Sequence, residues 1–253
     1  NNEDLSSIPL KVSTRYTFES IQQTFQVLQL LIQTISFKQH HTLSFIPVSE
    51  ISKVQKRVKT IYFKLEAQQS LDAFKTEIYQ LFELLNQAQP RSILHYFLQG
   101  YDEVMYTNQQ VSLIENLKMS ELAIIKMNDL VEMMHLLEDQ ETFPILHQAI
   151  ILPALSINTK DTLKLVNNGL SLEAIAQKEG VKLNTIEDHI IELYIKGYFT
   201  DYSLYLDKEV LNEFKTFYID RQEERLRNFK AAFPNMSYFE IKLAITILAR
   251  EGI

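Results

Sequence analysis

Apolar residues recur at three- and four-residue intervals along almost the whole chain, and this spacing constrains the fold more than any other feature. Such intervals place side chains on one face of an α-helix. Only five glycines occur among the 253 residues, and alternating apolar and polar runs are scarce. The hydrophobic share of 46% is enough for a real core. We therefore predict an all-α fold with little or no sheet.

The apolar residues at helical spacing predict a series of helices in the first part of the chain. The first carries Phe18, Ile21, Phe25, Leu28, Ile32 and Ile35; the second carries Ile51, Val54, Val58, Ile61, Phe63 and Leu65. Ser70 is expected to cap a third helix that ends before Pro90. Shorter helices are expected over residues 92–99, 109–117, 120–137 and 143–152. Pro153, in a break around residues 152–158, divides a helical domain over residues 1–153 from a second domain over 154–253.

The most specific pattern lies at the start of this second domain. Helices are expected over residues 158–168, 172–179 and 184–196. Ser171 caps the second helix, Gly180 provides the turn, and Asn184 caps the third, with Glu187 reaching back to the cap amide. The small core would hold Ile175, Ala176, Val181, Ile186, Ile190 and Leu193. Together these features predict a helix-turn-helix.

The residues after Gly197 do not provide the two strands and hairpin of a winged version. Residues 198–206 are at most one extended segment. Asp207 opens a helix, residues 221–230 are expected to continue helically as far as Pro234, and Ser237 with Glu240 forms a capping box for a last helix. We expect a wingless module with additional helices packed on it.

A second, weaker pattern covers residues 107–137. The spacing of Thr107, Val111, Leu117, Ser120 and Leu122 repeats that of the helix-turn-helix, with Asn116 in place of the turn glycine. Many helix pairs share such spacing. A degenerate second helix-turn-helix and an ordinary helix pair therefore both remain open.

The second domain resembles a known family. The likeness is carried by Gly169-Leu-Ser-Leu-Glu-Ala-Ile-Ala176, Thr185-Ile-Glu-Asp-His-Ile190, Gly197-Tyr198 and Ser237-Tyr-Phe-Glu-Ile-Lys-Leu-Ala244. Residues 159–251 are similar to the helicase-associated helix-turn-helix domain of RecQ-type DNA helicases. The YpbB-like family carries this domain without a motor, and this chain likewise lacks a phosphate-binding Gly-x-x-x-x-Gly-Lys loop. The resemblance implies a RecQ-type helicase as partner, in DNA repair and recombination.

Charge argues against strong autonomous DNA binding. The net charge is −7, with −5 in residues 1–158 and −2 in residues 159–253. The expected recognition helix carries Glu187, Asp188 and Glu192, which would repel phosphates. Its candidates for contact with DNA or a partner are Lys182, Asn184, Thr185, His189 and Lys196. Protein contact, a purely structural role and major-groove contact all remain open for this helix.

Two basic clusters are further candidates for binding DNA or a partner. Arg221, Arg225, Arg227 and Lys230 are expected on one helix, with acids between them. Lys53, Lys56 and Arg57 lie near one face of a helix with few acids adjacent. The alternative for both clusters is an ordinary solvated face.

Several kinds of protein are not expected. No nucleophile–base set or Gly-rich loop appears, so we expect no enzyme and no cofactor. There are no cysteines, and the adjacent His40 and His41 lack a third ligand nearby, so no metal site is expected. No apolar run could span a bilayer and no signal peptide is apparent, which favours a cytoplasmic protein. The chain starts with Asn1 rather than Met, so it is expected to begin inside a longer gene product.

Two functions follow from these observations. The first is a non-enzymatic accessory protein that binds a RecQ-type helicase and contacts DNA weakly, without sequence preference. The second is a DNA-binding transcriptional regulator that recognises an operator through its helix-turn-helix. The sequence leaves the oligomeric state and the helicase interface undetermined.

Overall fold

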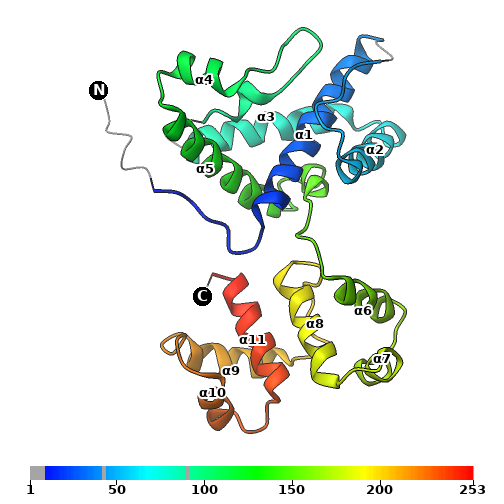
Figure 1. The fold of residues 1–253 in the computed structure, drawn as a ribbon, viewed down its shortest axis with the longest axis vertical. Helices are drawn as coiled ribbons and strands as arrows, with labels where there is room; N and C mark the ends of the chain where they lie inside the picture. The colour runs from blue at the N-terminus through cyan, green and yellow to red at the C-terminus, as the bar shows by residue number, and fades with distance from the viewer. Residues whose placement is uncertain (1–8, 42–43, 89–91, 253) are drawn as a thin grey trace. The chain divides into compact units, whose positions relative to one another are not determined.

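The computed structural model describes residues 9–41, 44–88 and 92–252 (Figure 1). Eleven α-helices and no β-strand are formed within these residues. The all-α prediction is therefore confirmed. Residues 198–206, where a wing would lie, form only turns and irregular chain.

The chain divides into two compact units, one ending at Ile151 and the other beginning at Leu152. The break falls where Pro153 interrupts the apolar sequence. Each unit has its own buried core, so we describe the units separately.

The described part of the first unit consists of five α-helices and two 3-10 turns. Its helices are α1 (Phe18–Gln39), α2 (Ser52–Ala67), α3 (Leu71–Ala88), α4 (Asn108–Glu115) and α5 (Met119–Glu138), with 3-10 turns η2 (Leu94–Phe97) and η3 (Leu146–Ala149). α1 packs against α2 and α5, and η3 lies among α1, α2, α3 and α5. Fully buried side chains from these elements form the core; they include Val27, Leu31, Leu81, Leu85, Met134 and Leu146.

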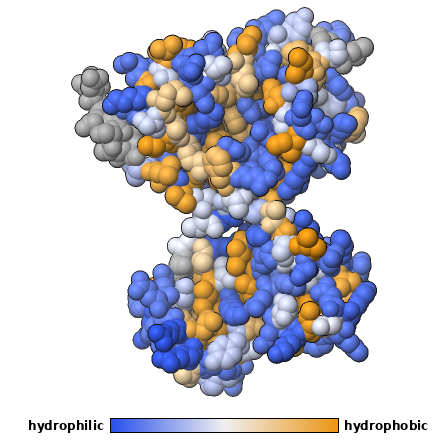
Figure 2. All heavy atoms as spheres, viewed as in Figure 1, coloured by the Kyte–Doolittle hydropathy of each residue, from blue (hydrophilic) through white to orange (hydrophobic). Residues whose placement is uncertain are grey.

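Several details of this unit differ from the expectations. The helices predicted over residues 92–99 and 143–152 are only single 3-10 turns. The hydroxyl of Ser70 is buried without a hydrogen-bond partner, so it does not cap α3. Phe63, expected on the apolar face of α2, is 62% exposed, and Phe18 is 56% exposed. Hydrophobic residues therefore interrupt the hydrophilic surface of this unit (Figure 2).

The link between α4 and α5 is a tight turn at Asn116. This residue has φ 50° and ψ 50°, the left-handed conformation that Asn tolerates better than most residues. Thr107 caps α4 by accepting a hydrogen bond from the Gln110 amide, and the Gln110 side chain completes a capping box. The expectation that Asn116 takes the special backbone position is confirmed.

The second unit contains the remaining six helices. They are α6 (Ile157–Asn167), α7 (Leu172–Glu179), α8 (Leu183–Ile195), α9 (Lys208–Tyr218), α10 (Leu226–Ala232) and α11 (Tyr238–Arg250). Asp207 caps α9, and Ser237 with Glu240 forms the expected capping box of α11. α11 packs against α8, α9 and α10, and α6 and α7 also pack against α8.

Candidate nucleic-acid and partner interface

Helices α6, α7 and α8 form the helix-turn-helix. The Ser171 hydroxyl accepts a hydrogen bond from the Ala174 amide at the start of α7. Gly180 ends this helix with φ 68°, and the Val181 amide then donates to the Ala176 carbonyl at 3.0 Å. Since a side chain is strained at such a φ, glycine permits the short turn into α8.

The start of the recognition helix was predicted wrongly. α8 begins at Leu183, its N-cap residue is Lys182, and no side chain caps it. Asn184 lies inside the first turn, so the expected pair of Asn184 and Glu187 does not form a capping box. Val181 is also 40% exposed rather than part of the small core. Only Val181 separates Gly180 from the cap residue Lys182, so α8 is capped two residues earlier than expected.

α8 is packed along most of its length. Near its N-terminus Ile186 is buried with Ile175 and Ala176 of α7. Further along, Ile190, Leu193 and Tyr194 belong to the larger core that α9, α10 and α11 complete. Little of the surface of α8 is therefore exposed to contact a ligand, and most of the exposed residues lie at its N-terminal end.

The exposed residues at that end are Lys182, Asn184, Thr185 and Asp188. Asp188 forms an ion pair with Lys242 of α11 at 2.7 Å, which reduces its repulsion of a phosphate. Burial raises the pKa of the neighbouring Glu187, as does the charge of Asp188, while Lys242 lowers it. The exposed face thus carries one unpaired cation among the described residues, Lys182, beside two carboxylates.

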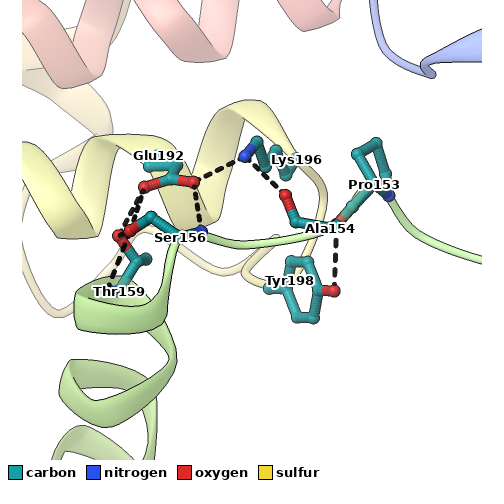
Figure 3. Close-up of polar contacts among 7 residues, drawn as sticks. All are labelled: Pro153, Ala154, Ser156, Thr159, Glu192, Lys196 and Tyr198. Atoms are coloured by element: carbon teal, nitrogen blue, oxygen red, sulfur yellow. Dashed lines mark hydrogen bonds and ion pairs between the residues drawn. The ribbon is translucent and has the colours of Figure 1, made fainter.

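Lys196 and Glu192 hold the helix-turn-helix to the chain that precedes it (Figure 3). The Lys196 ammonium donates to Glu192 Oε1 at 2.5 Å and to the Ala154 carbonyl at 2.7 Å. The Ser156 amide and the Thr159 hydroxyl also donate to Glu192. Burial alone would raise the pKa of Glu192, but the hydrogen bonds from Lys196, Thr159 and Ser156 outweigh it and lower the pKa.

This network changes the interpretation of Lys196. Its ammonium, predicted as a DNA or partner contact, is bound within the domain, and Tyr198 fixes the same segment by donating to the Pro153 carbonyl at 3.0 Å. The separation of three residues between Ser156 and Thr159 suits a helix cap, but the sequence gives no sign that Glu192 would receive both groups.

Two other candidates on α8 face a hollow between helices. Thr185 and His189 line a space of about 570 Å³ beside α6 and the end of α7. The Thr162 hydroxyl lies 2.7 Å from His189 Nδ1, so the imidazole is held against α6. The same hollow contains the ion pair of Lys164 and Asp161. With charges of both signs, it offers no basic groove for a phosphate backbone.

The basic cluster of residues 221–230 does not lie on one helix, contrary to the prediction. Arg221 is in the turn after α9, where its guanidinium lies over the Phe217 ring at 4.2 Å. Arg225 is the N-cap of α10. Lys230 donates to the carbonyls of Pro234 and Met236, so it stabilises the loop that follows. Of the four, only Arg225 and Arg227 are exposed without a partner among the described residues.

The cluster on α2 does lie along one helix. Lys53 and Lys56 are exposed, but Arg57 donates to the Gln148 carbonyl at 2.9 Å. Lys59, which was not among the predicted candidates, lies on the same helix, is exposed and lines a groove beside α1. The proximity of the groove could not be inferred from the sequence of α2 alone.

Metal binding and membrane-spanning helices are two further features that the described residues could provide. No group of three or more His, Asp or Glu side chains is arranged to hold a metal ion there. None of the described helices is both long and apolar enough to cross a membrane.

Comparison with known proteins agrees with the geometry of the second unit. Residues 158–245 match a family described as a helix-turn-helix domain. Over 231 residues the chain is 27% identical to protein YpbB of Bacillus subtilis (strain 168). The matched region covers 87% of this chain and 63% of YpbB. The chain thus spans less than two thirds of that curated relative. No solved structure matches the chain significantly. The protein is therefore similar to YpbB, and it carries a helix-turn-helix domain.

Proposed function

We propose that this protein is a non-enzymatic accessory factor that binds a RecQ-type DNA helicase and supports its action in DNA repair and recombination. It works in the cytoplasm and contacts DNA weakly, without sequence preference. The similarity to YpbB and the helix-turn-helix domain support a DNA-associated accessory or regulatory role. The helicase as partner rests on the family resemblance of residues 159–251.

The observation that carries this proposal is the character of the exposed face of α8. A helix that recognises bases in the major groove offers polar and basic side chains toward the DNA. Here Asp188 and Glu187 share the face with Lys182, and the ammonium of Lys196 is bound to Glu192 and Ala154. Such a surface is better suited to protein contact, with any DNA contact made by basic patches elsewhere.

The transcriptional regulator is the second candidate, and one observation favours it. Lys182, Asn184 and Thr185 are all exposed at the N-terminal end of α8. This is the part of a recognition helix that usually contacts base edges. A regulator of this kind would bind one duplex sequence far more tightly than others.

A paired experiment distinguishes the two functions. The tagged chain is tested for retention of a purified RecQ-type helicase, and its binding to duplexes of unrelated sequence is titrated with salt. We expect helicase retention without added DNA, and weak DNA binding that falls steeply with salt and is equal for all duplexes. Tight binding to one sequence at physiological salt, without helicase retention, would establish the regulator instead.

A further inference from the structure

An apolar groove runs between α1 and α2 in the first unit. Its space is about 360 Å³, near the lower end of the ~300–1,000 Å³ range of small-molecule pockets. Leu30 of α1 and Val58 of α2 form part of its floor, and both are 4% exposed. Phe45 and Phe63 also line it, with Phe63 exposing 62% of its surface. The groove is thus open to solvent and can receive one or two bulky apolar side chains.

A lysine from each of the two helices lines this groove. The Lys38 ammonium of α1 lies 3.9 Å from the centre of the Tyr62 ring, and Lys59 of α2 is exposed. Lys53 and Lys56 continue the basic surface along α2, whose first turn contains no acidic residue. On a chain of net charge −7, this concentration of lysines selects an anionic partner.

The polar groups of the groove distinguish between an apolar side chain and a nucleobase. The Thr34 hydroxyl donates to the Leu30 carbonyl, and the side-chain amide of Gln55 donates to the Ser49 carbonyl. The Tyr62 hydroxyl is hydrogen-bonded to Glu66. Because these groups already have partners, a buried base would find few donors or acceptors for its polar edge, at an energetic cost. An apolar side chain has no such requirement.

We infer that the α1–α2 groove binds an acidic segment of a partner protein by taking up one bulky apolar residue, while Lys38 and Lys59 contact the flanking carboxylates. Aromatic anchors in pockets commonly dominate the affinity of such contacts. This inference deepens the proposed function, because it rests on the chain acting through protein contact. It does not depend on which protein supplies the segment.

The absence of tryptophan from the chain allows a direct test. The probe is a short synthetic peptide rich in Asp and Glu that contains a single Trp, so all tryptophan fluorescence comes from the peptide. We expect a blue shift of the emission on titration with the full chain. The same peptide with Ala in place of Trp, followed by fluorescence anisotropy of an attached dye, should bind at least about tenfold more weakly.

Variants of the chain locate the binding site. Phe63→Ala and Lys59→Glu should each weaken peptide binding about tenfold. Tyr79→Ala removes a 77% exposed aromatic side chain from α3 and should leave binding unchanged. Lys56→Glu is the matched charge control, because it lies on the same helix outside the groove lining, and should cause a smaller loss. Circular dichroism checks that each variant is folded.

Three results would overturn the inference. The first is no blue shift at any concentration, and the second is unchanged affinity in Phe63→Ala. The third is binding of an oligo-dT strand that competes with the peptide and is lost in Phe63→Ala, which would make the groove a nucleic-acid site. If the helicase is retained but the peptide does not bind, only the groove inference fails. If the peptide binds and the helicase is not retained, the proposed function fails and the groove remains.

Discussion

Asn116 and Gly180 occupy equivalent turn positions in two helix pairs, α4–α5 and α7–α8, 64 residues apart in the chain. Both have the left-handed conformation, with φ 50° and 68° respectively. The amide of the residue after each donates to a carbonyl five residues earlier, at 2.9 Å from Leu117 and at 3.0 Å from Val181. The same shift of 64 aligns α4 with α7 residue for residue, and the start of α5 with that of α8. The α4–α5 pair therefore repeats the local turn geometry of α7–α8.

The turn residues predict different responses to substitution. Gly180→Ala should destabilise the protein by about 1–2 kcal/mol, because a residue with a Cβ is strained in the left-handed conformation. No atom lies within 4 Å of the position that a Cβ would take, so backbone strain alone is tested. Gly180→Asn should cost less, because Asn tolerates this conformation, as Asn116 does. Urea unfolding of both variants beside the parent measures the difference; equal losses would contradict this account.

The elements that sequence predicted well are those fixed by local chemistry. Ser171, Asp207 and Ser237 each cap the helix expected of them, because a cap needs only the side chain and the next few amides. The turns at Asn116 and Gly180 could also be predicted from the sequence, since few residues adopt the left-handed conformation without strain. The helix-turn-helix could therefore be identified from its own residues.

The parts that were missed depend on distant contacts. A helix was expected through residues 221–230, but the chain turns back after α9. The reversal brings Phe229 and Phe233 against Phe214, with ring centres 5.5 Å and 5.3 Å apart. The sequence of residues 221–230 contains no local signal that predicts this packing. In the same way, Lys196 was predicted to be free to contact DNA or a partner, but its ammonium donates to the Ala154 carbonyl.

The buried Asp129 of α5 predicts a change of stability with pH. Its side chain is fully buried, and burial raises its pKa to about 6, although Ile93 and Ser92 donate to one of its oxygens. The folded state therefore holds a proton more tightly than the unfolded state. The stability that this group contributes is fully present below about pH 4 and is lost as the pH rises through about 6.

Replacing this carboxyl group tests the effect. Asp129→Asn keeps an acceptor for the Ile93 amide and removes the buried charge. The difference in unfolding free energy between variant and parent should change by about 2 kcal/mol between pH 4 and pH 7, in favour of the variant at the higher pH. Urea unfolding across this range measures it, with Asp102→Asn at an exposed carboxyl as control. A difference that does not vary with pH would show that Asp129 does not titrate in this window.

The acidic face of α8 predicts the effect of neutralising it. Glu187→Gln together with Asp188→Asn removes repulsion of phosphates and should raise nonspecific DNA affinity, most clearly at low salt. Stability should change little, because Glu187 does not cap α8 and the ion pair of Asp188 with Lys242 is exposed. Anisotropy titrations with a labelled duplex at several salt concentrations measure the gain. Unchanged affinity would mean that DNA does not approach this face.

The exposed cations predict where assembly with the helicase is sensitive. Lys53→Glu with Lys56→Glu on α2, and Arg225→Glu with Arg227→Glu at α10, should each weaken binding of the helicase or of the helicase–DNA complex. Arg57 and Lys230 are left intact because their hydrogen bonds to Gln148, and to Pro234 and Met236, support the fold. Surface changes of this kind alter stability by only about 0.5 kcal/mol each. A loss of binding can then be assigned to the interface.

Salt dependence and a matched control complete this last test. Because exposed charges are screened within about 10 Å at 0.1 M salt, the loss from each double reversal should be largest at low salt. Lys118→Glu reverses a lysine side chain that is 81% exposed outside both clusters, and it should bind the helicase like the parent. If both double variants also bind like the parent at low salt, the clusters are ordinary solvated faces. The helicase would then have to contact exposed apolar residues such as Tyr238 or Leu204, which are 51% and 79% exposed.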